Sequence, residues 1–409
     1  MTAQLAYATY SYVEDAATNA LAGKRILLVG AYANDRSHSM TLFARLLKRE
    51  LIAKGVAVTL LEPPAPLGRW VKRSHALRKW IGYLDKFVIF PVLLRRAARQ
   101  HDLVHICDHS NAMYLAWLKD FPNLITCHDL IGVHGGQGLY QEHRVRFTGR
   151  LFQRWVAKHL GRAEHVACVS EFTRAALSKT FPHLEPRASV VPNGLNYAYA
   201  PMPVAQSDAL LSTLGLSPDD CYVMHVGHNS WRKNRLGALK IFGRYLALRP
   251  TPVRLVMVGD PLDASMRDYL ATQDWGHRVV QLSNLSPEAL QALYSRAEFL
   301  LFPSLHEGFG WPIIEAQSCG CVVVTSNRAP MNEVGGAGAI YIDPERHLDA
   351  AAVIIRESQH ADRWRSAALS NAQRYSAARM AAGYTRAYAA LLAQHEETGR
   401  VSLSFSPPL

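Results

Sequence analysis

Short apolar runs separated by polar turns recur along the chain and predict the strands of two parallel sheets. In the first half, such runs occupy residues 25–30, 56–61, 102–107, 123–127 and 165–169. In the second half, they occupy residues 222–226, 254–258, 278–282, 299–302 and 322–325. Runs this short and this apolar are typical of strands buried on both faces. Helical spacing between them, for example at 40–53 and 235–248, predicts an α/β fold with two Rossmann-like, doubly wound halves.

The same pattern sets the expected domain organisation. A chain of 409 residues suits two domains of about 150–200 residues each. The turn at 192–194 ends the first domain, and we interpret the proline-containing stretch 195–219 as a linker. We predict an N-terminal arm at 1–23, an N-terminal domain at 24–200, a C-terminal domain at 201–375, and a last helix with a tail at 376–409. The helical pattern near the end extends over about 362–395.

The net positive charge of the chain comes entirely from its first half. Residues 1–200 contain 26 Lys and Arg and 14 Asp and Glu, a difference of +12, whereas residues 201–409 contain 19 of each. Nine of the basic residues lie at 66–100, interleaved with aromatic residues and opposed only by Asp85. This segment predicts contact with an anionic membrane surface. An ordinary helix with a solvated basic face is the alternative. Nucleic acid is not expected, because no nucleic-acid module is recognisable.

Cysteine content and apolar runs predict a protein of the cytoplasm that is peripheral, at most, at the inner membrane face. No apolar run approaches the roughly 20 residues that span a bilayer, and no basic start precedes an apolar segment at the N-terminus. Apolar, strand-like surroundings predict buried, reduced thiols at Cys107, Cys127, Cys168 and Cys221. Cys319 and Cys321 form an isolated Cys-x-Cys, which does not indicate zinc.

Two carboxylates flank a glycine turn just after the apolar run at 299–302. Glu307 is followed by Gly308-Phe309-Gly310 and by a helix start with Pro312 in its first turn, and Glu315 lies within that helix. A turn that opens a helix presents free backbone N–H groups to an anion. The carboxylates can accept hydrogen bonds from sugar hydroxyls. The alternative is an acid near the helix start and a solvated glutamate on the helix.

This stretch resembles the Glu-x7-Glu signature of the retaining glycosyltransferases of family 4, the group 1 glycosyl transferases, which have the GT-B fold. Residues 316–326 look like that family's helix, tight turn and next strand, and residues 331–336 and 342–344 look like its following loop. The resemblance covers most of residues 25–395. It implies two Rossmann-like domains whose parallel sheets face a central cleft, and a C-terminal helix that crosses back to the N-terminal domain.

Two adjacent cations follow the predicted strand at 222–226. Arg232 and Lys233 lie in the polar run that starts at Gly227, and unpaired cations are rarely buried for packing alone. They suit a diphosphate, because Arg can form two hydrogen bonds to it while Lys acts as a point charge. The run resembles the family's Gly…Arg-Lys-Asn segment, in which Arg and Lys hold the donor diphosphate. Many members place the Arg where this chain has His228. A solvated helix start is the alternative.

The resemblance assigns further donor contacts. Glu315 would hydrogen-bond the nucleotide ribose, and Glu307 would hold the donor sugar and phosphate together with the backbone of Gly308, Phe309 and Gly310. Asp260, Leu282 and Leu285 follow predicted strands of the same sheet, and we interpret them as candidates for the base pocket, since ligands of such sheets bind beyond the carboxyl ends of strands.

In the first half, residues 126–130 resemble the family's strand-end His-Asp pair. On this basis His128 would face the reacting sugar or the acceptor, and Asp129 would lie on the acceptor side; a histidine at a strand end is otherwise often structural. Ser37 and His38, in the turn after Gly30, are further acceptor-side candidates, although this turn lacks the family's double glycine. The absence of GxGxxG also argues against NAD. Ser170 is expected to cap the helix that follows it.

The resemblance implies a retaining hexosyltransferase, of the mannose or glucose type, that acts in polysaccharide or glycolipid biosynthesis. The donor would be a GDP- or UDP-linked sugar and the acceptor a hydroxyl of a saccharide or lipid-linked saccharide. We expect no cofactor and no metal, because no Asp-x-Asp follows a predicted strand and Arg232 and Lys233 are available for the diphosphate. A sugar-nucleotide epimerase, a phosphorylase and a non-catalytic sugar-nucleotide binding protein are the open alternatives.

Overall fold

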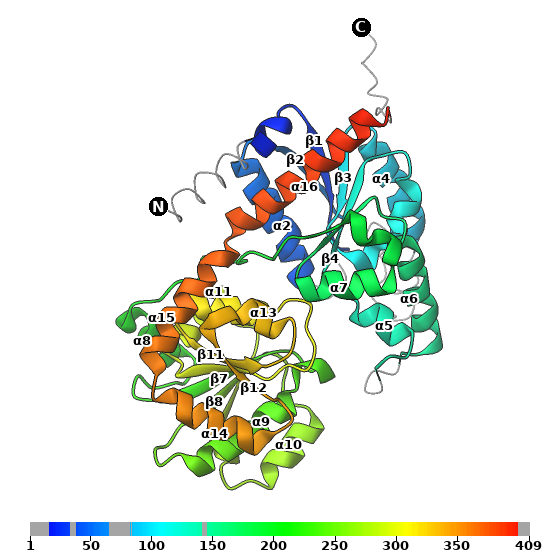
Figure 1. Ribbon diagram of the computed structural model, residues 1–409. Coiled ribbons are helices and arrows are strands. Elements are labelled where there is room, and N and C mark those ends of the chain that lie inside the picture. Colours follow the sequence, from blue (N-terminus) through cyan, green and yellow to red (C-terminus); the bar gives the residue numbers. More distant parts are fainter. Residues whose placement is uncertain (1–15, 33–37, 65–81, 83, 141–144, 400–409) are drawn as a thin grey trace. The chain divides into compact units, whose positions relative to one another are not determined.

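A computed structural model describes residues 16–32, 38–64, 82, 84–140 and 145–399 of the chain (Figure 1). The chain divides into two compact units. One comprises residues 1–196 and 377–409, and the other comprises residues 197–376. Within the described ranges, no helix combines the length and the apolar character needed to cross a membrane.

The first unit is built on a six-stranded parallel sheet. Its strands lie in the order β2-β1-β3-β4-β5-β6. Their bounds are β1 Arg25–Val29, β2 Ala57–Leu61, β3 Leu103–Ile106, β4 Asn123–Cys127, β5 His165–Cys168 and β6 Ala188–Val190. The central strands β1, β3 and β4 are buried over nearly their whole length, because helices cover both faces of the sheet (Figure 1).

Apolar side chains of helices fill the two faces of this sheet. On one face, Phe90 and Leu94 of α4 and Val156 and Leu160 of α6 pack against the strands. On the other face, α2 and α16 pack on each other. The helices of this unit are α2 His38–Ala53, η1 Asp85–Ile89, α4 Phe90–Ala98, η2 His109–Trp117, α5 Ile131–Gly136, α6 Phe147–Leu160, α7 Glu171–Thr180, η3 Pro182–Arg187 and α16 Ala377–Glu397.

A buried polar network fastens α16 to the sheet of the first unit. The ring of His105 on β3 lies 2.6 Å from the Tyr388 hydroxyl and 2.7 Å from the Thr126 hydroxyl, and Thr126 lies 2.8 Å from the hydroxyl of Tyr384. Burial lowers the pKa of His105 to about 3, so the imidazole is neutral at pH 7. A chain segment more than 250 residues downstream of β4 therefore completes the core of this unit.

The second unit repeats the plan with a different strand order. Its six parallel strands lie in the order β12-β11-β10-β7-β8-β9. Their bounds are β7 Tyr222–Val226, β8 Arg254–Val258, β9 Val279–Leu282, β10 Phe299–Phe302, β11 Val322–Ser326 and β12 Ala339–Ile342. The order reverses between β7 and β10. Loops leave the sheet in opposite directions at such a point, which makes it the preferred ligand site of an open α/β sheet.

The helices of the second unit cover both faces of this sheet. Alternate residues of β10 face opposite sides, and Phe299 and Leu301 join the core beneath α9 and α14. Helix starts carry local signals, as at Ser286, whose hydroxyl accepts from the N–H of Ala289 at the start of α11. The helices are α8 Val204–Thr213, η4 Trp231–Lys233, α9 Arg235–Leu248, α10 Ala264–Ala271, η5 Gly276–Arg278, α11 Pro287–Arg296, α12 Trp311–Ser318, α13 Met331–Gly335, η6 Gly336–Gly338, α14 His347–Ser358, α15 Ala361–Ala372 and η7 Gln373–Tyr375.

The structure corrects four expectations. Residues 195–219 are not a plain linker, because α8 lies within them and packs on α11. The last helix is not continuous over 362–395, because η7 separates α15 from α16. The short edge strands β6 and β12 were not expected. Cys221 is exposed rather than buried, since it directly precedes β7.

Candidate functional site

The candidate site of the second unit lies at the switch point between β7 and β10. The loop after β7 begins at Gly227, whose N–H donates to the carbonyl of Val258 on β8. The loop after β10 meets it, because the N–H of Leu305 donates to the carbonyl of Arg232 over 2.7 Å. The first link ties the loop after β7 to β8, and the second holds the residues after β7 and β10 side by side.

A compact group of three charges forms where the two loops meet. Glu307 Oε2 lies 2.5 Å from Nη1 of Arg232, and Glu307 Oε1 lies 2.6 Å from Nζ of Lys233. The side chains of Lys233 and Glu307 are 10% and 6% exposed, whereas that of Arg232 is 23% exposed. Lys233 Nζ also lies 4.8 Å from the centre of the Phe302 ring. The three charges sum to +1, so the group retains a net positive charge.

The pKa values of Lys233 and Glu307 are both lowered in this group, for different reasons. Burial lowers the pKa of Lys233, and the neighbouring charge of Glu307 offsets only part of that effect. Burial alone would raise the pKa of Glu307, but the charges of Lys233 and Arg232 outweigh it and hold that pKa below its usual value. Glu307 is therefore ionised at neutral pH and keeps two cations together in a buried place.

The glycine turn after Glu307 leads directly into α12. Gly310 has φ +106° and occupies the N-cap position, a left-handed conformation that suits glycine, and Pro312 lies in the first turn as expected. The side chain of Phe309 packs against Tyr375, with ring centres 5.6 Å apart. Phe309 can therefore contribute to a ligand site through its backbone only.

Glu315 lies inside α12 and is buried. The hydroxyl of Tyr294, on α11, donates to its Oε2 over 3.0 Å. This contact fixes one face of the carboxylate within the second unit. The predicted bond between Glu315 and a ribose remains a prediction.

Arg235 is a buried cation that the sequence analysis missed. Its Nη1 donates to the carbonyl of Asp260 over 2.8 Å and to the side chain of Asn229, and its Nη2 lies 3.2 Å from Gln281 Oε1. Arg235 therefore ties together the loops after β7 and β8 and the end of β9. The signal in the sequence was its place at the end of the polar run that starts at Gly227.

The other predicted donor residues surround these loops. Much of His228 is exposed, but the partial loss of solvent around its ring, together with the charges of Lys233 and Arg232, lowers its pKa. Asp260 is exposed, and its Oδ2 accepts from the N–H of Asn229 over 2.7 Å. Leu282 and Leu285 are half-buried at the end of β9. Asp260 thus follows β8, which neighbours β7, and Leu282 ends β9, which lies beyond β8.

His225, a buried histidine on β7, makes the stability of the protein depend on pH. Nδ1 of His225 lies 2.9 Å from the carbonyl of Leu301, and burial lowers the pKa of His225 to about 3. The folded state therefore binds fewer protons than the unfolded chain between about pH 3 and 6.5. Above about pH 6.5 the neutral His225 does not lower the free energy of unfolding. As the pH falls from about 6.5 to 3, we expect His225 to lower the free energy of unfolding by about 1.4 kcal/mol per pH unit.

The variant His225→Asn keeps a donor for Leu301 and removes the titrating ring. Urea unfolding of both proteins at several pH values between 7 and 5 measures the two slopes. His105 has a similarly low pKa and contributes to both proteins, so the difference between the slopes isolates His225. Equal slopes would contradict this assignment.

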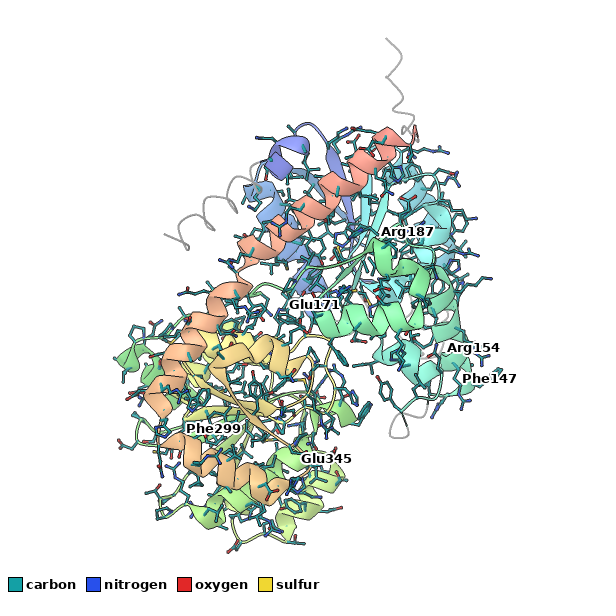
Figure 2. The ribbon with its side chains drawn as sticks, in the orientation of Figure 1. Phe147, Arg154, Glu171, Arg187, Phe299 and Glu345 are labelled. Atoms are coloured by element: carbon teal, nitrogen blue, oxygen red, sulfur yellow. The ribbon has the colours of Figure 1, made fainter. Side chains whose placement is uncertain are left out.

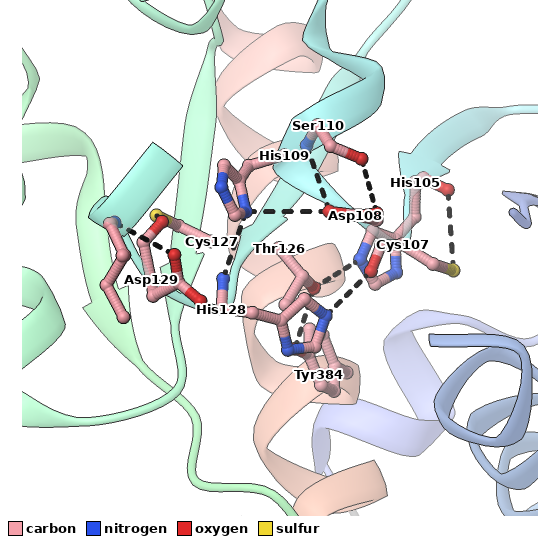
Figure 3. Close-up of polar contacts among 11 residues, drawn as sticks. His105, Cys107, Asp108, His109, Ser110, Thr126, Cys127, His128, Asp129 and Tyr384 are labelled. Atoms are coloured by element: carbon pink, nitrogen blue, oxygen red, sulfur yellow. Dashed lines mark hydrogen bonds and ion pairs between the residues drawn. The ribbon is translucent and has the colours of Figure 1, made fainter. Parts of the chain in front are cut away.

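In the first unit, His128 lies at the carboxyl end of β4, as predicted (Figure 3). Its Nε2 lies 2.9 Å from the carbonyl of Cys107, which assigns the proton to Nε2 and leaves a lone pair on Nδ1. Phe43 packs edge-on against the ring, 4.8 Å between centres. Burial is the largest effect on the pKa of His128 and lowers it, so the ring is neutral at pH 7.

Figure 3 shows two further residues that sequence reasoning missed, Asp108 and His109, at the end of β3. Asp108 accepts from the N–H and the hydroxyl of Ser110, and its Oδ1 lies 3.5 Å from Nδ1 of His109. The same nitrogen accepts from the N–H of His128 over 3.4 Å. The loops after β3 and β4 are thereby joined. The strand-end rule, applied to β3 as it was to β4, would have found both residues.

The remaining acceptor-side candidates have different positions. Asp129 Oδ1 accepts from the N–H of Ile131 at the start of α5, so this carboxylate shapes the turn that follows β4. Ser37 and the side chain of His38 lie outside the described residues. The hydroxyl of Ser170 accepts from the N–H of Thr173, which confirms its predicted capping role.

Two family models match the chain. One, described as glycosyl transferases group 1, matches residues 208–370, and the other, described as glycosyltransferase family 4, matches residues 40–199. O-antigen chain mannosyltransferase B of Escherichia coli is 28% identical over 59% of this chain. O-antigen chain mannosyltransferase RfbU of Salmonella typhimurium is 26% identical over 54% of it. The chain spans 62% and 56% of the length of these two relatives.

Solved structures with a similar fold cover nearly the whole chain. Sucrose-phosphate synthase from Thermosynechococcus elongatus superposes with a TM-score of 0.66 at 20% identity, covering 92% of this chain and 98% of that one. HepE of Anabaena, in complex with UDP and glucose, superposes with a TM-score of 0.62 at 17% identity, covering 92% of this chain and 99% of that one. At these identities the likeness concerns the fold.

Proposed function

Because the chain belongs to the group 1 glycosyltransferases and has their two-domain GT-B fold, we propose that it transfers a hexose from a nucleotide-diphosphate sugar to a hydroxyl of a saccharide or lipid-linked saccharide. The observation that carries the proposal is the Arg232–Glu307–Lys233 group at the switch point of the second sheet. A buried group with net charge +1 suits an anionic ligand. A leaving diphosphate gains negative charge in the transition state, and fixed cations stabilise it there.

Each residue of this group has a distinct part in the proposed reaction. Arg232 forms hydrogen bonds to the departing diphosphate, and Lys233 acts on it as a point charge. Glu307 keeps both cations in place and orients the donor sugar. The backbone N–H groups at the start of α12 add a favourable dipole for the phosphate. Glu315 is proposed to bind the ribose.

We propose that the anomeric configuration is retained. The acceptor hydroxyl attacks from the face that the diphosphate leaves, with no nucleophile from the protein. His128 is the proposed contact of the reacting sugar or the acceptor. Its Nδ1 lone pair can accept a hydroxyl proton, since its Nε2 is occupied by the carbonyl of Cys107.

The donor is proposed to be GDP- or UDP-linked, and bound without a metal. The relatives named as mannosyltransferases favour mannose, whereas a solved neighbour holds UDP and glucose. Arg232 and Lys233 supply the positive charge that a divalent cation would otherwise bring. A product in polysaccharide or glycolipid synthesis would place the enzyme in the cytoplasm, near the inner membrane face. Most of the basic segment at 66–100 lies outside the described residues.

A transfer assay tests the proposal. The protein is incubated with GDP-mannose or UDP-glucose, with and without a saccharide acceptor, in the presence of EDTA. We expect a product only when acceptor is present, and an α linkage by proton NMR, because these donors carry an α anomeric bond. Glu307→Gln serves as the site control and should lose most of the activity. Epimerised donor, a need for inorganic phosphate, or donor binding with no turnover would favour one of the alternatives and contradict transfer.

A further inference from the structure

Helix α6 of the first unit carries an exposed apolar row. Phe147, Leu151 and Trp155 lie four residues apart, on one side of the helix, with exposed fractions of 71%, 48% and 38%. Val156 and Leu160, on the opposite side, are buried in the core. Phe147 and Leu151 therefore project away from the core, and Trp155 is only partly covered, by the ring of Phe87. Figure 2 shows the side chain of Phe147 on the outer side of α6.

A basic row runs beside the apolar one. Arg146, Arg150, Arg154 and Lys158 also lie four residues apart, and all four are exposed. Figure 2 shows Arg154 on the same outer side as Phe147. Among the described residues, no carboxylate forms an ion pair with any of the four. The outer side of α6 thus combines large apolar side chains with positive charge that no described carboxylate pairs with.

The helix formed by η1 and α4 extends this surface. Leu84, Val88 and Val92 are exposed, with Val92 at 65%, and again follow a spacing of four. Arg96 and Arg99 are exposed at the end of the same helix. The two helices meet where Phe87 packs against Trp155, with ring centres 5.0 Å apart. We call this combined surface the α4–α6 face.

We propose that the α4–α6 face is a binding surface for an anionic lipid bilayer. A helix that lies in the plane of a membrane buries an apolar row between the headgroups and places Arg and Lys beside the lipid phosphates. Both rows are present here on two adjoining helices. A second copy of the chain is a poor occupant, because apposing two identical basic rows brings like charges together.

Lipid binding by the α4–α6 face does not depend on the transfer reaction. The α6 part of this face lies outside residues 66–100, whereas the η1 and α4 part falls within the segment that the sequence analysis favoured. A vesicle assay measures lipid binding alone, so its failure and the failure of the proposed function are distinguishable.

The test is flotation of the full chain with vesicles of phosphatidylcholine alone or mixed with phosphatidylglycerol. We expect binding to the mixed vesicles and little to phosphatidylcholine. Arg150→Glu/Arg154→Glu/Lys158→Glu should weaken the partition coefficient by at least about a hundredfold, because losing each basic residue near an anionic surface costs about fivefold and each added carboxylate is repelled in addition. The matched control is Arg162→Glu/Lys179→Glu/Arg187→Glu. It changes the net charge equally at exposed positions of the same unit and should bind far better.

A second pair of variants tests the apolar row. Phe147→Ser/Leu151→Ser should weaken binding at high salt, where screening reduces the electrostatic part. Val204→Ser/Leu348→Ser is the control, because both residues are exposed apolar side chains of the other unit. A third variant carries an environment-sensitive fluorophore on Leu151→Cys, in a Cys221→Ser background that removes the exposed thiol. Its emission maximum should move to shorter wavelength when mixed vesicles are added, because the dye enters an apolar medium.

Three outcomes would overturn the proposal. The first is no binding of the full chain to vesicles that contain phosphatidylglycerol. The second is binding that the two charge-reversal variants reduce equally, which would indicate net charge rather than this face. The third is a dimer in solution that Phe147→Ser/Leu151→Ser abolishes without any vesicle binding, which would assign the face to a second copy.

Discussion

Lys233→Ala is expected to lower the rate of sugar transfer by about 10²–10³-fold, equivalent to about 2.7–4 kcal/mol of transition-state stabilisation. Lys233 Nζ is 2.6 Å from Glu307 and belongs to a group whose net charge is +1. Without Lys233, Glu307 and Arg232 cancel, and no net positive charge remains for the leaving diphosphate. Steady-state kinetics with varied donor would show the loss in kcat as well as in kcat/KM.

Loss of folding is the competing explanation for such a result, and two further variants separate it. Lys233→Met keeps an unbranched side chain of similar length and removes the charge that lies over the Phe302 ring. Lys233→Met/Glu307→Gln also removes the carboxylate that would otherwise lose a partner. We expect both variants to be inactive, and their melting temperatures relative to wild type show whether the loss of activity is accompanied by a loss of stability. Near-normal turnover in Lys233→Met would contradict the assigned role.

Gly259→Ala is expected to destabilise the second unit by about 3–4 kcal/mol and to abolish donor binding. Gly259 follows β8 with φ +134°, and an added Cβ would lie 2.1 Å from the carbonyl oxygen of Gly227. The loops after β7 and β8 would have to separate. That movement would displace the chain that leads to Arg232 and Lys233.

Gly215→Ala is the matched control for the backbone conformation. Gly215 also has a left-handed φ, +78°, but an added Cβ there has no described atom within 4 Å. We expect it to cost only about 1–2 kcal/mol. Urea unfolding of both variants gives the comparison. Equal losses of stability would show that the contact between Gly259 and Gly227 has little energetic effect.

The sequence was sufficient for the fold class and for most strands. Central strands such as β1, β7 and β10 are buried on both faces, so each is a continuous apolar run that stands out from its polar surroundings. The prediction of two Rossmann-like parallel sheets is confirmed. The edge strand β6 was missed because it has only three residues, all half-buried, and β12 because its surroundings were interpreted as a loop of the family. The helix α8 was missed because three prolines near it suggested a linker.

In the candidate site, single residues could be predicted from the sequence, but contacts between residues far apart in the chain could not. Arg232, Lys233 and Glu307 could be named from their positions after strands and from the family resemblance. Their mutual pairing could not, because it joins residues 74 and 75 positions apart through the sheet order. Arg235 was missed for a related reason. Its partners lie on the loops after β7 and β8 and on β9 itself, and only the folded sheet brings them together.

The most direct test of the central claim is the binding of nucleoside diphosphates in EDTA. UDP, GDP and ADP, with CMP as a control, are added to the wild type and to Lys233→Met, and the shift in melting temperature is recorded. A ligand at a hundredfold excess over its dissociation constant stabilises the native state by about 2.7 kcal/mol. We predict a selective shift with GDP or UDP that needs no Mg²⁺ and is lost in the variant. No shift with any diphosphate, a shift only with Mg²⁺, or an equal shift in Lys233→Met would contradict the proposed site.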